Sequence, residues 1–139
     1  MARSYIGGMK RLFAAAALVA AFVAPAQAAS RDPDAVLADL LKGRVAEPPV
    51  RCISVSPGMG SSQIVRGRAI VWRSGGRLYV NVPRGRADTL DDDDILITEP
   101  FGSQLCRNDQ VRPLNRLSRI PKAALLLGDF TPYVRRAPK

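Results

Sequence analysis

Residues 1–28 have the three parts of a secretory signal peptide. Cations come first, an apolar run follows at residues 12–24, and small residues end the segment at Ala26 and Ala28. The apolar run is shorter than the roughly 20 residues that a helix needs to cross a bilayer. We therefore expect cleavage between Ala28 and Ala29, and a soluble mature chain in the periplasm or outside the cell, with no membrane anchor.

That compartment decides the chemistry of Cys52 and Cys106, the only cysteines in the chain. Exported proteins meet oxidising conditions, so the two cysteines are predicted to form a structural disulfide. Closing a loop of about 55 residues contributes about 4 kcal/mol in the chain-entropy model. A redox or nucleophilic role is the alternative, but it needs a nearby base or a C-x-x-C arrangement, and neither is visible.

The remaining chain, about 111 residues, has the length of one domain. Its parts are predicted as a helix with a Pro-rich linker at 29–49, a β-rich domain at 50–134 and a basic, frayed tail at 135–139. In the helix, Asp32 is the expected N-cap and Pro33 the first helical residue. One face is apolar, Lys42 lies in the last turn and Gly43 caps the end. The apolar residues are Val36, Leu37, Leu40 and Leu41. The helix packs on the domain, or else forms a loose arm or a partner-binding segment.

Short runs rich in β-formers, separated by turn residues, predict antiparallel strands. These lie at 50–55, 64–73, 78–82, 95–98, 103–106, 109–114 and 129–134, with 83–94 as a polar loop. Ser74-Gly75-Gly76 predicts a tight hairpin turn. Pro113 is expected to place its strand at a sheet edge, and 121–127 fits either a helical turn or a strand. The predicted fold is mainly β: a short N-terminal helix, then an antiparallel meander that forms a sheet or a small barrel, with one disulfide.

The chain contains no histidine, which removes the commonest general base, histidine-dependent triads and the usual zinc ligands. A small hydrolase using paired carboxylates stays open as a third option. We expect no catalysis, no cofactor and no catalytic or cofactor-binding residues. The leading expectation is a binding or envelope accessory protein whose ligand the sequence does not reveal.

One acidic run, Asp91, Asp92, Asp93 and Asp94, is the candidate metal site. Calcium needs six to eight oxygens from a loop that curls around it, and the run lacks the alternation and the mid-loop glycine of an EF-hand. The competing interpretation is a solvated loop in which one aspartate caps a turn. The Gly-rich segment 58–62 has no lysine after it, so it is a hairpin connection rather than a phosphate loop.

The chain is basic, with 21 lysines and arginines against 12 acids. A cationic exported protein meets anionic envelope polymers and extracellular nucleic acid, which makes binding to either the alternative function. Aromatic side chains beside arginines would stack on bases, although aromatics on strands also fill cores. The candidates are Trp72, Tyr79, Phe101, Phe130 and Tyr133 with Arg66, Arg68, Arg73 and Arg77.

Four short motifs together resemble a family of small exported proteins of sphingomonad-type bacteria, a domain of unknown function. The motifs are Cys52-Ile53, Gly76 to Asn81, Gly102 to Asp109 and Leu127 to Tyr133, within residues 50 to 134. The resemblance implies an exported compartment and a fold, but no activity. Family members carry a second cysteine pair, at positions that correspond here to Ala87 and Leu125. The resemblance therefore implies that these two residues lie close together, with Leu125 buried.

Overall fold

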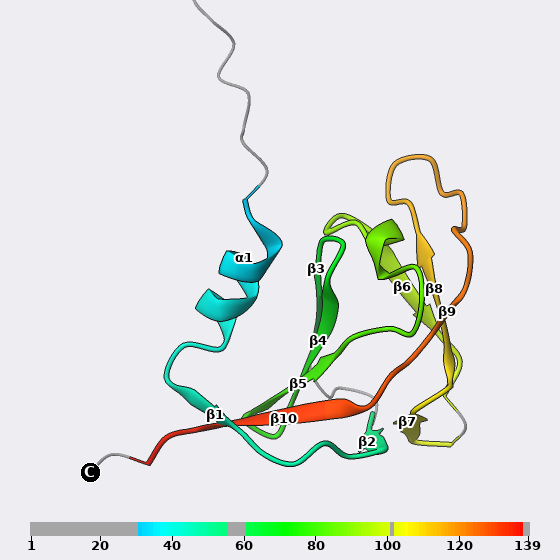
Figure 1. The fold of residues 1–139 in the computed structure, drawn as a ribbon. Helices are drawn as coiled ribbons and strands as arrows, with labels where there is room; N and C mark the ends of the chain where they lie inside the picture. Colours follow the sequence, from blue (N-terminus) through cyan, green and yellow to red (C-terminus); the bar gives the residue numbers. More distant parts are fainter. Residues whose placement is uncertain (1–30, 56–60, 101, 138–139) are drawn as a thin grey trace, which may run out of the picture.

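A computed structural model of the protein describes residues 31–55, 61–100 and 102–137. It is mainly β, with one short N-terminal helix, antiparallel sheets and one disulfide, as the sequence predicts (Figure 1). The predicted signal peptide with its cleavage site between Ala28 and Ala29, most of the Gly-rich segment and Phe101 lie outside the described residues.

Each described element is short. The helix is α1 (Pro33–Leu40), and a single 3-10 turn is η1 (Ala87–Thr89). The strands are β1 (Arg44–Ala46), β2 (Cys52–Ser54), β3 (Ser62–Val65), β4 (Ala69–Ser74), β5 (Arg77–Asn81), β6 (Ile95–Thr98), β7 (Gln104–Cys106), β8 (Gln110–Leu114), β9 (Leu125–Leu126) and β10 (Phe130–Arg135).

The described strands form three antiparallel sheets. The largest has the order β1-β10-β5-β4-β3, the second pairs β2 with β7, and the third has the order β6-β8-β9. Figure 1 shows α1 beside the largest sheet and the β6, β8 and β9 strands on the other side of the molecule. The strand order differs from a simple meander because β10 inserts between β1 and β5.

The helix packs on the domain, which confirms the first of the three roles considered for it. Asp32 caps it, since its carboxylate accepts a hydrogen bond from the Asp34 N–H at 3.1 Å, and Pro33 is the first residue. The helix ends at Leu40, so Lys42 lies in the following turn rather than in the last helical turn. Gly43 takes the left-handed conformation there, with φ +73°.

Two apolar clusters lie on the two faces of the largest sheet. On one face, α1 contributes Val36, Leu37, Leu40 and Leu41 to a cluster with Val65, Ala69, Val71, Leu78 and Val80. The other face packs on the small sheets through Ile53, Ile64, Ile70, Trp72, Leu90, Leu105, Val111, Leu125, Leu127 and Phe130. Trp72 and Phe130 meet edge to face there, with ring centroids 5.5 Å apart.

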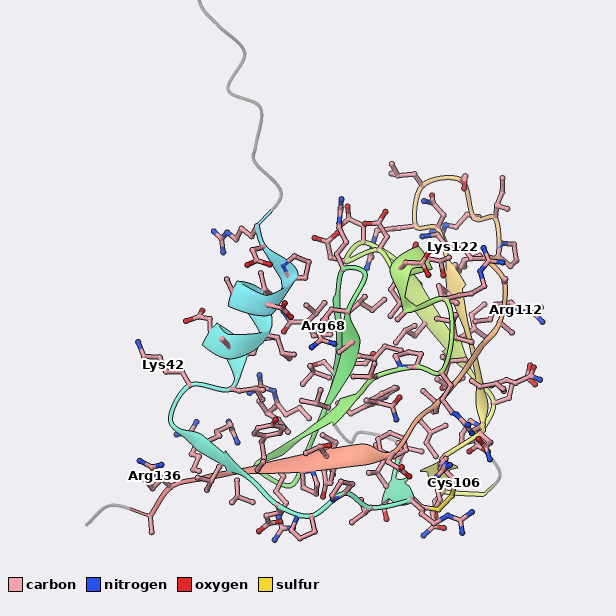
Figure 2. The ribbon with its side chains drawn as sticks, in the orientation of Figure 1. Lys42, Arg68, Cys106, Arg112, Lys122 and Arg136 are labelled. Carbon is pink, nitrogen blue, oxygen red and sulfur yellow. A yellow bond between two sulfur atoms is a disulfide. The ribbon has the colours of Figure 1, made fainter. Side chains whose placement is uncertain are left out.

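The disulfide joins β2 to β7 and confirms the predicted pairing. Cys52 and Cys106 lie directly opposite each other in the two strands, 54 positions apart in sequence. Figure 2 shows the bond at Cys106 near β2. The disulfide therefore links the two strands of the smallest sheet covalently. Only three residue pairs join these strands in the sheet.

The buried side-chain amide of Asn81 fixes the backbone just before β10 begins. The Asn81 side chain donates a hydrogen bond to the Gly128 carbonyl at 2.8 Å and accepts one from the Gly128 N–H at 3.0 Å. A Cβ atom on Gly128 would collide with the Val82 carbonyl oxygen, so only glycine lets the backbones approach this closely.

One strand prediction was wrong in its boundaries. The run 64–73 is not one strand, because the chain reverses at Gly67 (φ +63°) and forms the hairpin β3–β4. The next hairpin, β4–β5, has the predicted turn at Gly75 and Gly76. Residues 44–46, before the linker prolines, and Arg135, the first residue of the predicted tail, also belong to the largest sheet, where Arg44 pairs with Arg135.

The prediction that Pro113 lies on an edge strand was wrong. β8 is the central strand of its sheet, between β6 and β9. Proline is tolerated because β9 is only two residues long and pairs with Gln110 and Val111, before Pro113 is reached. The ambiguous segment 121–127 contains this strand, so it is extended rather than helical.

Leu125 is buried, as predicted. The neighbouring backbone brings the two segments of interest together, because the Arg84 N–H donates to the Leu126 carbonyl at 2.8 Å. A direct contact between Ala87 and Leu125 stays a prediction.

Candidate functional site

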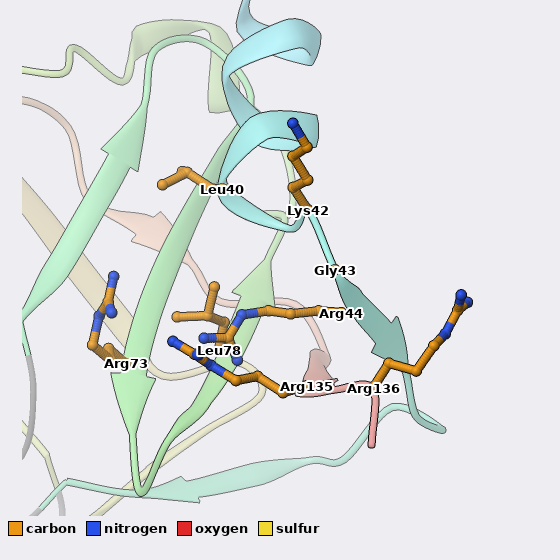
Figure 3. A pocket seen from close by; sticks show the side chains of 8 residues that line it. All are labelled: Leu40, Lys42, Gly43, Arg44, Arg73, Leu78, Arg135 and Arg136. Atoms are coloured by element: carbon orange, nitrogen blue, oxygen red, sulfur yellow. The ribbon is translucent and has the colours of Figure 1, made fainter. Parts of the chain in front are cut away.

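A cationic pocket of about 490 Å³ lies where the C-terminal end of α1 stops covering the largest sheet. It is lined by Leu40, Lys42, Gly43, Arg44, Arg73, Leu78, Arg135 and Arg136 (Figure 3). Five of these eight residues are cationic and none is acidic or aromatic. The floor is aliphatic, from Leu40 of the helix and Leu78 of β5.

Strand register places three of the arginines on one face of the sheet. Arg44 of β1 lies opposite Arg135 of β10. Arg73 of β4 lies opposite Leu78 of β5. Leu78 is also opposite Tyr133 of β10, and residues two apart on a strand share a face. The arginines therefore surround Leu78 from both sides.

Arg44 and Arg135 form a like-charge pair on neighbouring strands, which is a destabilising arrangement. Figure 3 shows their guanidinium groups side by side near Leu78, with Arg73 across from them. Arg44 is held in place by two backbone carbonyls, at 3.0 Å from Gly76 and 3.4 Å from Tyr133. These carbonyls orient the guanidinium but do not neutralise it. Lys42 and Arg136 extend away from the floor.

No carboxylate of the described residues lies within 4.0 Å of the five pocket cations. Other arginines behave differently. Arg68 pairs with Asp34 at 2.7 Å, and Arg77 pairs with Glu47 at 3.2 Å. The acids of the chain thus neutralise cations elsewhere, and the pocket keeps its positive charge.

Three aspartates of the acidic run, Asp91, Asp92 and Asp94, contact the protein's own cations. Arg66 Nη2 lies 2.7 Å from an oxygen of Asp91 and 2.7 Å from an oxygen of Asp92. The first contact is an ion pair without hydrogen-bond geometry, and the second is also a hydrogen bond. Asp94 turns inward to Lys122. In the described chain, no group of three or more acids or cysteines is arranged to hold a metal ion.

Asp94 has a side chain only 1% exposed, and its Oδ2 accepts a hydrogen bond from Lys122 Nζ at 2.6 Å. The same oxygen accepts the Asp91 N–H at 3.0 Å. Lys122 Nζ also donates to the Thr89 carbonyl at 3.2 Å. The contacts of Lys122 with Asp94 and Thr89 join the acidic loop to the segment that follows β8. The Asp94 carboxylate therefore has a structural role.

Hydrogen bonding between Arg66 and Asp92 shifts both groups. It is the main cause that lowers the pKa of the Asp92 carboxyl, and it raises the pKa of the Arg66 guanidinium. A lowered carboxyl pKa keeps Asp92 ionised, whereas a general acid at neutral pH needs a raised one.

The surface of arginines and aromatics considered for nucleic acid is not assembled as expected. Trp72 and Phe130 are buried in the core, and Tyr79 packs against the same cluster. Arg66 and Arg68 have acidic partners. Of the four arginines in that candidate set, Arg73 alone joins the pocket.

Sequence reasoning missed Arg44 and Arg135 as site residues, because it assigned them to a linker and a frayed tail. The only local signal was the adjacent pair Arg135 and Arg136, which has no acidic residue next to it in the sequence.

Comparison of the chain with protein-family models, curated proteins and solved structures gave no match. The site is therefore interpreted from its own geometry. None of the helices in the described ranges has the length and apolar character needed to cross a membrane.

Proposed function

We propose that this protein is a non-catalytic exported binding module that holds an anionic envelope polymer in the cationic pocket. The periplasm or the extracellular medium is its proposed location, and the disulfide supports an oxidising compartment. The polymer is one that carries phosphate or carboxylate groups at regular intervals.

The observation that carries this proposal is the pair Arg44 and Arg135, opposite each other without a carboxylate partner in the described structure. An oxyanion between the two guanidinium groups would turn repulsion into two charge-assisted hydrogen bonds. Planar guanidinium forks fit phosphate and carboxylate oxygens in this way.

An envelope polymer is favoured over nucleic acid because the pocket floor is aliphatic. Single-stranded nucleic acids are held by aromatic side chains that stack on bases. Trp72 and Phe130, which would supply such stacking, contact each other inside the core. Nucleic acid binding is therefore an outcome that the experiment must distinguish.

The hydrolase alternative has less support from the described carboxylates. Asp91 and Asp92 contact Arg66, and Asp94 contacts Lys122. Each is held by a cation at 2.7 Å or less, rather than facing a second carboxyl across a substrate-sized gap.

The test compares affinities for soluble teichoic acid and for oligothymidine by fluorescence anisotropy at several salt concentrations. We expect wild type to bind teichoic acid more tightly than oligothymidine, with an affinity that falls as salt rises. The double variant Arg73→Gln/Arg135→Gln should bind at least about tenfold more weakly, since each charged hydrogen bond contributes about 1.5–3 kcal/mol.

The matched control is Arg51→Gln/Arg112→Gln, which removes the same charge from exposed positions outside the pocket. It should bind almost like wild type. Equal losses in the two double variants would mean that net charge, not the pocket, holds the polymer. Tighter binding of oligothymidine than of teichoic acid would replace the proposed ligand with nucleic acid.

A further inference from the structure

The loop that connects β8 to β9 is built to hold its shape, although it projects from the body of the molecule (Figure 1). It is closed at its base, where the Asn115 N–H donates to the Ile120 carbonyl at 3.1 Å. The Asn115 side-chain oxygen also accepts the backbone N–H groups of Leu117 and Ser118, at 3.1 and 2.9 Å. Hydrogen bonds of Asn115 therefore hold the loop in shape.

This fixed loop exposes its apolar side chains. Leu117 is 93% exposed and Ile120 is 65% exposed, the highest values among the large apolar residues of the described chain. A single exposed apolar side chain is ordinary, but two in one short projecting loop form an apolar patch. The hydrogen bonds of Asn115 fix the backbone that carries Leu117.

Cations alternate with these apolar residues. Arg116 and Arg119 flank Leu117, and Arg112 precedes the loop on β8. Within the described ranges, none of these three arginines has a carboxylate within 4.0 Å. Arg116 Nε donates a hydrogen bond to the backbone carbonyl of Asp93 at 3.1 Å, and Asp94 is paired with Lys122.

We propose that the β8–β9 loop is a membrane contact that inserts Leu117 and Ile120 into the headgroup region of an anionic lipid bilayer. An apolar tip ringed by arginines matches such an interface, where acyl chains lie beneath a layer of negative charge. A second copy of the chain is a poorer occupant, because a symmetric contact would bring the unpaired arginines of two loops together.

The contact would also orient the molecule. Figure 2 shows Lys122 and Arg112 on one side of the molecule, and Lys42 and Arg136 on the opposite side. With the loop on the bilayer, the cationic pocket would point away from the membrane. This inference does not depend on what the pocket binds.

Flotation of the protein with vesicles tests the contact. Vesicles of phosphatidylcholine mixed with phosphatidylglycerol should carry wild type, and vesicles of phosphatidylcholine alone should carry far less. Leu117→Ser should lower partitioning by about tenfold or more. Arg116→Gln/Arg119→Gln should lower it by about fivefold for each charge removed. Leu126→Ser is the matched control on β9, and it should behave like wild type.

A second measurement reports insertion rather than affinity. In Leu117→Trp, the new indole should shift its emission to the blue on binding and be quenched by brominated lipids. The native Trp72 is buried in the core and provides a constant background. Leu126→Trp should remain unquenched.

Three results would overturn the proposal. Wild type could fail to bind the anionic vesicles, Leu117→Ser could bind as well as wild type, or Leu117→Trp could bind without quenching. If instead wild type dimerises in the absence of lipid and Leu117→Ser does not, the loop is a contact between copies. If Arg73→Gln/Arg135→Gln alone abolishes vesicle binding, the pocket is the lipid contact.

Discussion

At the scale of single residues, the charged side chains of this protein form two kinds of arrangement. Asp94 and Lys122 form a mostly buried pair, whereas Arg44 and Arg135 face each other on a sheet. The first arrangement needs both partners, because a buried carboxylate without a cation is strongly destabilising. The second leaves two like charges without a carboxylate partner among the described residues.

We predict that Lys122→Met lowers the free energy of unfolding by about 3 kcal/mol, because it leaves the Asp94 carboxylate buried and unpaired. Chemical denaturation measures the change. The control is Lys42→Met, which removes an exposed lysine without an ion pair in the described structure and should change stability little. Equal stability of Lys122→Met and wild type would mean that the ion pair contributes nothing net.

Asp92 allows a prediction about pH. Its pKa is lowered in the folded protein, mainly by the Arg66 hydrogen bond, so its stabilising contribution is present above the unfolded pKa. That contribution is lost as the pH falls through the lowered folded value. Arg66→Gln should move the Asp92 pKa back up toward its ordinary range, which NMR titration of the side-chain carboxyl carbon would detect. An Asp92 pKa that stays low in Arg66→Gln would assign the shift to another group.

At the scale of elements, local patterns predicted what local interactions decide. The β4–β5 hairpin follows from its two glycines at positive φ, and α1 begins at a capping aspartate followed by proline. The edge strand β1 of the largest sheet could not be predicted from local patterns. β1 has three residues, too few to show an alternating pattern, and Arg44 contacts Tyr133, which lies 89 positions later. Register between such distant segments is not encoded in either segment alone.

The same limit explains why the pocket was not predicted from the sequence. Its cations come from β1, β4, β10, the residue after β10 and the turn after α1, so that no sequence motif contains them. The acidic run, by contrast, was visible in sequence, but its partners Arg66 and Lys122 were not. Knowing the partners changes its interpretation from a candidate cation site to a structural clamp.

For the helix, we predict that Asp32→Ala lowers the free energy of unfolding by about 1 kcal/mol, because the Asp34 N–H loses its acceptor. Hydrogen exchange should show the effect first in α1. Asp39→Ala removes the same charge within the helix and should cost less, since alanine favours helix. If the two substitutions prove equally destabilising, the cap is not the cause.

At the scale of the whole molecule, two small sheets and a helix surround the largest sheet, and one covalent bond holds β2 to β7. We predict that Cys52→Ala/Cys106→Ala lowers the free energy of unfolding by about 4 kcal/mol. Since a domain of this kind has a net stability of roughly 5–15 kcal/mol, the loss is a large share. Denaturation of the variant beside the oxidised wild type measures it, and a loss under about 1 kcal/mol would contradict the chain-entropy estimate.

The central place of β10 has a consequence for how the chain is made. A ribosome synthesises β10 after every other strand of the largest sheet, yet β10 must lie between β1 and β5. The largest sheet therefore cannot close during translation until residue 135 has emerged. Until then β1 has no neighbour to pair with. The β3–β4–β5 hairpins can form before that, but the edge strand β1 can join the sheet only through the last strand to be made.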